Sequence, residues 1–316
     1  MKKAIITGIN GQDGFYLSKL LLKKKYTLIG VDRIKRKPLI KNKKLKIFNI
    51  NLLSNDKVRA LLYKFKPDEI YHLAENSCDD KKHFSSIARL QNSNKILYNI
   101  LDANIILKAK FFYACSSEIF AKTKSKRQNE KTYLEPNSLY GLIKSSGFNL
   151  VRYYRNFFNQ FACSGILYNH DSYLRKSFFV IPTIIDQSFE ILKKKRNVFD
   201  VNNIYARRDW SSVEDFVFGF WKILNFNKAD DYIVSSGRSY SVLDIIKIVC
   251  SLQGLNYRKY VDFKKYKEIK STTSLVGDNK KLKSIGWKKK INLNQMLKKI
   301  IKHRIKHRIK HSKSYK

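Results

Sequence analysis

The sequence predicts an α/β fold, in which a doubly wound parallel sheet is joined by a smaller, interleaved C-terminal α/β lobe. In the first half of the 316 residues, short apolar segments alternate with longer amphipathic ones, which is typical of parallel strands connected by helices. The glycine-rich segment 7–14, TGINGQDG, follows the first apolar segment and precedes an amphipathic one. Glycines at such a strand-to-helix turn let backbone N–H groups face a pyrophosphate, which indicates a Rossmann-type sheet.

Six strands are expected in the first 168 residues, each of them a short apolar segment bounded by polar or turn residues. They span residues 3–7, 27–32, 45–49, 69–73, 110–115 and 162–167. The helices expected between them span residues 15–24, 54–65, 84–103 and 138–158. We expect the sheet to close near Tyr168.

The second half is less regular and predicts a separate lobe. Its expected helices span residues 181–195, 213–225, 242–252 and 293–303. The resulting domain assignment is a sheet domain at 1–168, joined by parts of about 205–235, a smaller lobe at 169–302 and a basic tail at 303–316.

The tail repeats Ile-Lys-His-Arg from Ile301 to His311. Isoleucines at every fourth position could extend the last helix, but the block of like charges favours a mobile, solvated tail, which is the interpretation we prefer. Histidines 303, 307 and 311 have the spacing of metal ligands on a helix, yet no cysteine or carboxylate joins them. No metal site is therefore expected.

Composition limits the classes of partner. The formal net charge is +40, which favours anionic ligands, but lysine is spread along the whole chain and no nucleic-acid recognition motif is present. Nucleic-acid binding is therefore unlikely. No uncharged apolar segment has the length of a membrane span, and glycines interrupt the apolar N-terminus before a signal peptide can form, so we expect a cytoplasmic protein. The four cysteines lack disulfide-scaffold or metal spacing, and reduced thiols are expected.

Three residues predict acid–base chemistry. Tyr140 and Lys144 are four residues apart on an expected helix, so a phenol and an ammonium share one face. The cation can stabilise a tyrosinate, which makes a general base from a weak acid. Ser116 follows an apolar strand and adds a hydroxyl. An ordinary helix pair is the alternative, because Tyr153 and Tyr154 lie in the same helix.

Five segments carry a resemblance to a known family. They are ITGINGQDG at 6–14, PDEIYHLA at 67–74, ACSSEIF at 114–120, PNSLYGLIK at 136–144 and GILYNHDS at 165–172, followed by RDW at 208–210, VGD at 276–278 and IGWK at 285–288. On these segments the chain resembles the extended short-chain dehydrogenases/reductases and, within them, the GDP-mannose 4,6-dehydratase family, from about residue 2 to about 302. The resemblance implies an NAD(P)-binding domain at 1–168 and a substrate-binding lobe at 169–302.

The resemblance implies a catalytic role for four residues. Tyr140 would take the proton of the sugar C4 hydroxyl, Ser116 would hydrogen-bond that oxygen, and Lys144 would hold the nicotinamide ribose. Glu118 would be the second base that water elimination requires, removing the C5 proton and helping the C6 hydroxyl to leave. A glutamate that caps the next turn is the alternative for Glu118.

The cofactor implied by the resemblance is NADP. Its expected contacts are Gly8, Gly11, Gln12, Asp13, Gly14, Asp32, Arg33, Asn51, Leu73, Tyr140 and Lys144. Asp32 departs from the family, because a carboxylate there would repel a 2′-phosphate and favour NAD. Arg33, Lys35 and Arg36 argue for NADP, and NAD stays possible.

The substrate implied by the resemblance is a nucleotide sugar, most plainly GDP-mannose. The residues expected to contact it are Asn76, Ser77, Asn169 and Arg208. The alternative for Arg208 is a surface pair with Asp209. The lobe departs from the family at residues 181–183 and 268–271, which leaves the nucleotide sugar open.

Two other functions remain open, together with the assembly of the chain. A related epimerase or 4-keto reductase is the first alternative, and a non-catalytic Rossmann-fold protein that binds nucleic acid or a partner is the second. By analogy with the family, we expect a homodimer or homotetramer.

Overall fold

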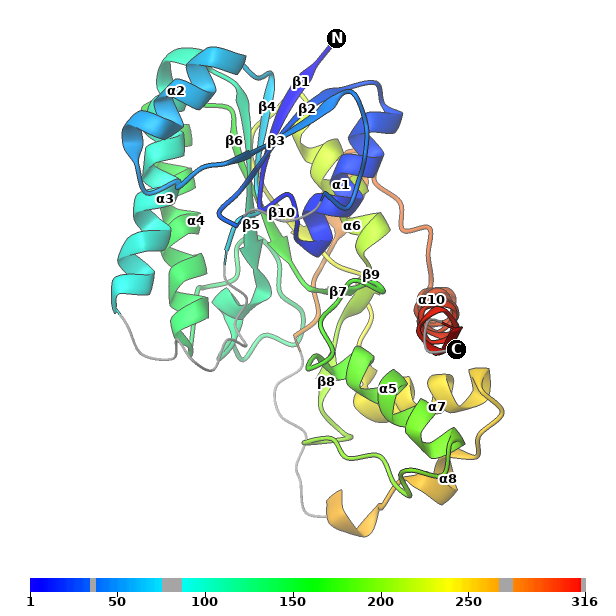
Figure 1. The fold of residues 1–316 in the computed structure, drawn as a ribbon. Coiled ribbons are helices and arrows are strands. Elements are labelled where there is room, and N and C mark those ends of the chain that lie inside the picture. The colour runs from blue at the N-terminus through cyan, green and yellow to red at the C-terminus, as the bar shows by residue number, and fades with distance from the viewer. Residues whose placement is uncertain (35–37, 76–86, 267–274, 314–316) are drawn as a thin grey trace.

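A computed structural model describes residues 1–34, 38–75, 87–266 and 275–313 (Figure 1). In this part of the chain, seven parallel strands form the main sheet in the order β10-β6-β5-β4-β1-β2-β3. The strands are β1 (Lys3–Thr7), β2 (Thr27–Asp32), β3 (Leu45–Asn49), β4 (Glu69–His72), β5 (Lys110–Ser116), β6 (Ala162–Leu167) and β10 (Asp231–Val234). The predicted doubly wound parallel sheet is confirmed.

The strand order reverses between β1 and β4. From β1 the chain adds β2 and β3 on one side, and from β4 it adds β5 and β6 on the other. In sheets of this kind, ligands bind outside the carboxyl ends of the strands, where the order reverses. These ends point toward the smaller lobe in Figure 1.

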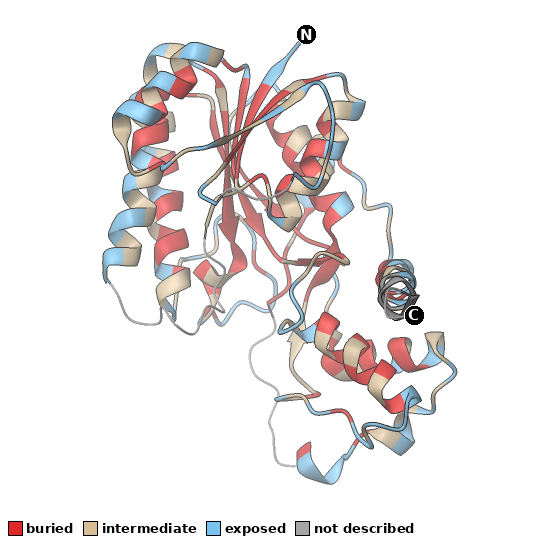
Figure 2. Cartoon of the chain, viewed as in Figure 1, coloured by how far each residue is buried: buried red, intermediate tan, exposed pale blue. Residues whose placement is uncertain are grey.

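Helices cover both faces of the sheet (Figure 1). One face carries α2 (Asn55–Phe65), α3 (Ile87–Leu107) and α4 (Leu139–Phe157), and the other carries α1 (Gln12–Lys23) and α6 (Val213–Leu224). Each helix buries an apolar stripe at helical spacing, such as Leu17 and Leu21 of α1, which are both fully buried. Phe220 of α6 stacks on Phe112 of β5 with ring centroids 4.7 Å apart. Figure 2 shows that the buried residues gather where the helices meet the sheet.

The smaller lobe has a hydrophobic core of its own, which includes the fully buried Ile184, Ile245 and Leu297. Its elements are α5 (Val180–Leu192), β8 (Arg207–Arg208), β11 (Tyr240–Ser241), α7 (Val242–Leu252), α8 (Tyr257–Tyr260) and α10 (Leu293–Lys313). Strands β7 (Asn169–Asp171) and β9 (Trp210–Ser212) pair in parallel between the sheet and the lobe. The short helix α9 (Lys280–Ser284) lies beside β10.

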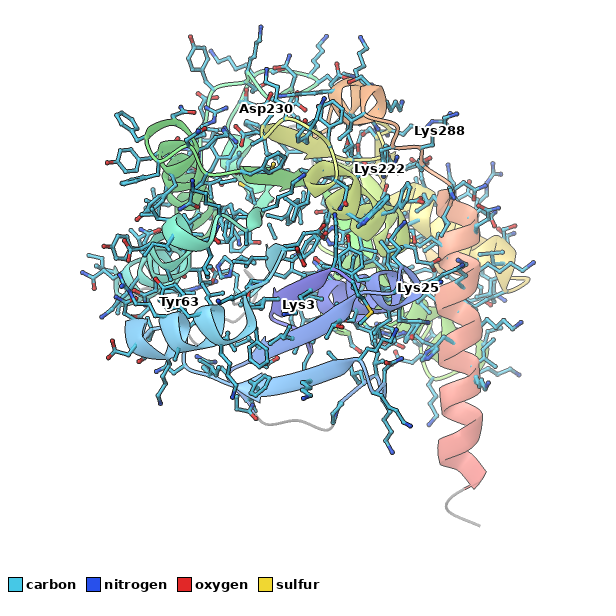
Figure 3. The ribbon with its side chains drawn as sticks, turned by 90° about the horizontal axis from the view of Figure 1, so that it is seen from above. Lys3, Lys25, Tyr63, Lys222, Asp230 and Lys288 are labelled. Carbon is cyan, nitrogen blue, oxygen red and sulfur yellow. The ribbon has the colours of Figure 1, made fainter. Side chains whose placement is uncertain are left out.

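Two expectations about the chain's organisation are wrong. The sheet does not close near Tyr168, because β10 pairs with β6 as a further strand and Tyr232 lies opposite Gly165. The preferred interpretation of the tail also fails, because helix α10 continues through Lys313 and extends past the rest of the chain (Figure 3). The ring of His303 stacks on Tyr173, with centroids 3.7 Å apart.

Packing accounts for the start of this extension. Ile301 is buried against the lobe core, and Arg304 forms an ion pair with Asp186 of α5. Tertiary contacts therefore stabilise a helix that its charge alone would disfavour.

Candidate active site

The glycine-rich turn after β1 is shaped by contacts that exclude side chains. Gly8 has a φ of +72°, and a Cβ there would lie 2.9 Å from the amide nitrogen of Ala74. At Gly14, a Cβ would lie 2.5 Å from the carbonyl oxygen of Gly8. Glycine is therefore required at both positions for steric reasons, in addition to any ligand.

Helix α1 begins directly after this turn. Gly11 is the N-cap of α1 and has no side chain to bond the first N–H groups of the helix. These N–H groups point toward the carboxyl edge of the sheet. Such an N-terminus stabilises a phosphate through its N–H groups and its dipole. The turn therefore fits the pyrophosphate of a dinucleotide.

The other predicted cofactor residues follow the carboxyl ends of neighbouring strands or lie in nearby loops, and they differ in burial and hydrogen bonding. Asp32 is half-buried at the end of β2, and its Oδ1 accepts the N–H of Ile34 at 3.1 Å. Leu73 follows β4 and donates its N–H to the carbonyl of Thr7 at 3.2 Å. Arg33 and Asn51 are exposed, with Asn51 capping a turn through the N–H of Leu53. Leu73 thus bonds to the first residue of the turn segment, and Asp32 follows Val31, whose carbonyl accepts the N–H of Gly8 at 2.9 Å.

Ser116 and Glu118 lie at the end of the neighbouring strand. Ser116 is the last residue of β5 and the N-cap of the 3₁₀-helix Ser117–Phe120. Its Oγ accepts the N–H of Glu118 at 3.3 Å, which fixes the first turn of this short helix. The cap of the turn is therefore the serine, and the half-buried Glu118 side chain is not needed for it.

Helix α4 presents Tyr140 and Lys144 to the same place. Ser138 caps this helix by accepting the N–H of Gly141 at 3.0 Å, so Tyr140 lies in the first turn. A Cβ on Gly141 would lie 2.8 Å from the carbonyl oxygen of Glu118. The first turn of α4 is therefore in direct contact with the 3₁₀-helix that carries Glu118.

Lys144 is buried in this contact. Its Nζ donates to the carbonyl oxygen of Ala114 on β5 at 2.9 Å and lies 5.7 Å from the centre of the Tyr140 ring. Burial lowers the pKa of Lys144, although the charges of Glu75 and Cys115 act in the opposite direction. The ring of Tyr113 on β5 lies nearer to Nζ, at 5.0 Å, and burial raises the pKa of Tyr113, so Lys144 lies between two phenol rings.

An ion pair, which the sequence reasoning missed, joins the cofactor turn to β7. His170 Nε2 lies 3.0 Å from each carboxylate oxygen of Asp13, and its Nδ1 lies 2.8 Å from the carbonyl oxygen of Tyr168. Both ring nitrogens face acceptors, so the imidazole must carry two protons to satisfy them. The ring also stacks on Phe216, with centroids 4.3 Å apart.

The pKa shifts of the pair agree with this geometry. Burial alone would lower the pKa of His170, but the charge and hydrogen bonds of Asp13 overcome it and raise the pKa. Burial alone would likewise raise the pKa of Asp13, and His170 lowers it. Gln12 strengthens the connection, because its Nε2 donates to the carbonyl of His170 at 3.2 Å and its Oε1 accepts from Ser172 at 2.9 Å.

This connection places Asn169, one of the predicted substrate residues, next to the residue that pairs with the cofactor turn. Asn169 precedes His170 on β7 and lies opposite Trp210 of β9. Trp210 is two residues after Arg208 in the chain. Arg208 is half-buried on β8 and donates to the carbonyl of Arg207 at 2.8 Å. Asp209 is buried rather than at the surface, and it accepts the backbone N–H groups of Ser236 and Gly237.

His72 is another residue that sequence reasoning did not select, although it lies in a quoted segment. Burial and the charge of Lys144 lower the pKa of His72 to about 3, so the ring is neutral. Its Nδ1 lies 2.8 Å from the hydroxyl oxygen of Thr7, which accepts the N–H of Ala74. This chain of hydrogen bonds fixes the end of β4 against the end of β1.

Some predictions lie outside the described residues, namely Asn76, Ser77, Cys78, Lys35 and Arg36. The other three cysteines are free and buried. Within the described ranges, no group of three or more histidine, cysteine or acidic side chains could hold a metal ion. In the same part of the chain, no helix is long and apolar enough to cross a membrane.

Comparison with known proteins shows the family. A model of the GDP-mannose 4,6 dehydratase family matches residues 5–300. The chain is 31% identical over 318 residues to GDP-mannose 4,6 dehydratase 1 of Arabidopsis thaliana, which covers 94% of this chain and 88% of the relative. It is also 31% identical over 263 residues to the GDP-mannose 4,6 dehydratase of Drosophila melanogaster, covering 78% of this chain and 67% of the relative.

Solved structures share the fold at lower identity. The UDP-glucose 4-epimerase of Thermotoga maritima superposes with a TM-score of 0.84 at 16% identity, covering 96% of this chain and 99% of that one. The dTDP-glucose 4,6-dehydratase of Bacillus anthracis gives a TM-score of 0.83 at 15% identity, covering 97% of both chains. By the family match over residues 5–300, the chain belongs to the GDP-mannose 4,6 dehydratase family of NAD(P)-dependent hydro-lyases.

Proposed function

We propose that this protein converts GDP-mannose to GDP-4-keto-6-deoxy-mannose with loss of one water. Family membership supports the substrate. The observation that carries the proposal is the contact of α4 with the 3₁₀-helix, in which a Cβ at Gly141 would lie 2.8 Å from the Glu118 carbonyl. This contact brings the segments that bear Tyr140 and Glu118 together, and dehydration needs two bases where a reductase needs one.

The proposed cofactor is NADP, held at the turn after β1. The side-chain-free turn at Gly8 and Gly14 and the uncapped start of α1 support a bound pyrophosphate. The further proposed contacts are Gly11, Gln12, Asp13, Asp32, Arg33, Asn51, Leu73, Tyr140 and Lys144. Held by these residues, the cofactor would supply reversible hydride exchange with the sugar, which needs an acceptor at C4 and a donor at C6. Asp32 keeps NAD as the alternative.

Residues of α4 and the end of β5 perform the first proton transfer. Tyr140 as phenolate accepts the proton of the C4 hydroxyl, and Ser116 donates a hydrogen bond to that oxygen. Lys144 stabilises the phenolate by its charge and is held in place by the Ala114 carbonyl at 2.9 Å. Because this lysine is buried, little solvent screens its charge.

Glu118 performs the elimination. Once C4 is a ketone, the proton on C5 is acidic, and the Glu118 carboxylate removes it. The C6–O bond then breaks, and the carboxylic acid gives the proton to the departing hydroxide, which leaves as water. The carboxylate is thereby regenerated. Return of hydrogen to C6 requires C5 to regain a proton, and Tyr140 gives back the one it took from the C4 hydroxyl, so both residues end the cycle as they began.

The proposed substrate contacts are Arg208, Asn169, Asn76 and Ser77. The guanidinium of Arg208 suits a diphosphate because of its planar set of donors. Asn169 is adjacent to His170, which pairs with Asp13 in the cofactor turn. The proposed substrate and cofactor sites are therefore connected by this pair.

The proposal includes a homodimer or homotetramer in the cytoplasm. Helices α3 and α4 expose large apolar side chains on one face of the molecule, namely Tyr98, Ile106, Tyr153 and Phe157. A shallow groove between these helices is lined by Tyr98, Leu150 and Tyr153. An exposed apolar face of this kind fits a second copy of the chain, and analytical ultracentrifugation measures the assembly.

Incubation of the purified protein with GDP-mannose and a catalytic amount of NADP tests the function. Mass spectrometry should detect a product lighter by one water, with no net consumption of cofactor. Stoichiometric oxidation of added NADPH would indicate a 4-keto reductase instead, and an isomer of unchanged mass would indicate an epimerase. Salt-sensitive binding of DNA without any turnover would favour the non-catalytic alternative.

A further inference from the structure

A basic groove lies beside strand β8, outside the residues of the proposed active site. It has a volume of about 800 Å³, which suits a small molecule of nucleotide size. Five of its eleven lining residues are cationic and none is acidic, so the groove selects for anions. The cationic residues are Lys124, Lys126, Arg127, Arg207 and Arg238.

The groove is separate from the proposed substrate arginine. Arg207 lines it and Arg208 does not, although the two are consecutive residues of β8. Consecutive side chains of a strand project to opposite faces. A ligand in contact with Arg207 therefore lies on the other side of the strand from a substrate held by Arg208.

Two of the arginines are held in place by neutral acceptors. Arg127 donates through Nη2 to the carbonyl of Gly237 at 3.2 Å, and Arg207 donates through Nη2 to the carbonyl of Ser239 at 2.9 Å. Carbonyl groups orient a guanidinium without cancelling its charge. The carboxylate closest to Arg207 is that of Asp244, whose Oδ2 lies 4.0 Å from Nη1.

The remaining three cations have no ion pair within the described ranges, and all three are exposed. They are Lys124, Lys126 and Arg238. Like charges that line one groove repel each other, and a bound polyanion would relieve this repulsion. Oriented guanidinium groups also add directional hydrogen bonds to phosphate oxygens.

We propose that this groove is a second anion site, which binds a small ligand carrying two or more linked phosphates. The ligand is distinct from the sugar nucleotide and the dinucleotide of the proposed active site. A single phosphate would engage only part of the cationic lining, whereas a linked pair or triplet can contact the arginines and the lysines together.

Inorganic tripolyphosphate is the probe, added to the full chain already saturated with NADP and GDP. Isothermal titration calorimetry should show one further saturable site per chain. The double variant Lys126→Gln/Arg238→Gln should weaken this binding at least about tenfold. The control is Lys57→Gln/Lys64→Gln, which removes the same charge from exposed positions on α2 and should change the affinity less than about twofold.

Two results would overturn the proposal. Equal weakening by the control variant would mean that the overall positive charge attracts the probe without a site. Competition of tripolyphosphate with GDP or NADP would place its binding in the active site. Because the titration does not depend on turnover, a negative dehydratase assay would leave this test intact.

Discussion

His170 Nε2 lies 3.0 Å from both carboxylate oxygens of Asp13, which ties strand β7 to the first turn of helix α1. The two residues are separated by 157 positions in the chain. One belongs to the turn proposed to hold the cofactor, and the other is adjacent to Asn169, proposed to contact the sugar nucleotide. A change in either half of the site can therefore reach the other through this ion pair and the hydrogen bonds of Gln12.

The Asp13–His170 pair predicts a pH-dependent stability. The pKa of His170 is raised on folding, so its contribution is complete below the unfolded pKa and is lost as pH rises through the folded pKa. The pKa of Asp13 is lowered, so its contribution is present above its unfolded pKa and is lost as pH falls through the folded value. Arg175, which pairs with Asp171 at 3.7 Å, also faces this cluster.

Urea unfolding across pH measures this effect. We expect His170→Gln to cost about 2 kcal/mol near neutral pH and to flatten the alkaline decline of the unfolding free energy. Asp13→Asn should have a similar cost, and the double variant should cost less than the sum. Additive costs would contradict a direct interaction of the two side chains.

Glu118→Gln should separate oxidation from elimination. The backbone turn is capped by Ser116, so the substitution leaves the local fold intact. We expect dehydration to fall by about a hundredfold or more, while cofactor binding persists. Reduced cofactor should accumulate on addition of substrate, seen as its near-ultraviolet absorbance. Glu190→Gln, on α5, is the control, and full activity of Glu118→Gln would refute the second base.

Tyr140→Phe should abolish the first oxidation. Loss of the proton acceptor predicts a fall in kcat of about a thousandfold with little change in cofactor affinity. Tyr63→Phe removes the same hydroxyl from α2, outside the proposed site and outside the exposed apolar face, and should leave kcat unchanged. Single-turnover formation of reduced cofactor is the measurement, and equal effects of the two variants would exclude Tyr140 as the base.

Gly141→Ala should impair the site without unfolding the protein. The new Cβ meets the Glu118 carbonyl at 2.8 Å, so α4 and the 3₁₀-helix must separate. We expect a loss of about 1 to 3 kcal/mol in stability and a larger loss in kcat than in substrate affinity. The control is Gly219→Ala on α6, where a Cβ makes ordinary contacts at 3.4 Å. Unchanged kcat would show that this contact does not position the bases.

Asp32→Asn should shift cofactor preference toward NADP. Removing a carboxylate from the end of β2 removes repulsion of a 2′-phosphate, worth about 1 to 2 kcal/mol at this degree of exposure. Dissociation constants for NADP and NAD give the ratio, with Asp56→Asn on α2 as the control. An unchanged ratio would place Asp32 away from the ribose.

Local patterns were sufficient for much of the fold and for the main candidates. The strands at residues 3–7, 27–32, 45–49 and 162–167 match the predicted bounds, because each is a short apolar segment with a clear turn on both sides. Ser116, Tyr140 and Lys144 are proposed from spacing and chain order, and the contact of α4 with β5 brings their segments together.

Features that depend on distant pairing were missed. Strand β10 lies within the 205–235 segment that was expected to join the sheet domain, but no strand was predicted there. The role of these four residues is set by β6, which precedes them by more than sixty positions. His170 and Asp13 both lie in quoted segments, but nothing local links them. The helical tail was misjudged because the burial of Ile301 and the contact of His303 with Tyr173 depend on the folded lobe.

Strand β10 also constrains how the molecule can move. The chain leaves the sheet after β6, returns at α6 and β10, and departs again into β11, so several covalent connections join the two hydrophobic cores. The lobe therefore cannot rotate freely about one linker, as a domain attached by a single connection can. A protease cut in the 193–203 loop should leave both fragments bound to each other. Any movement of the lobe against the sheet must bend all of these connections together.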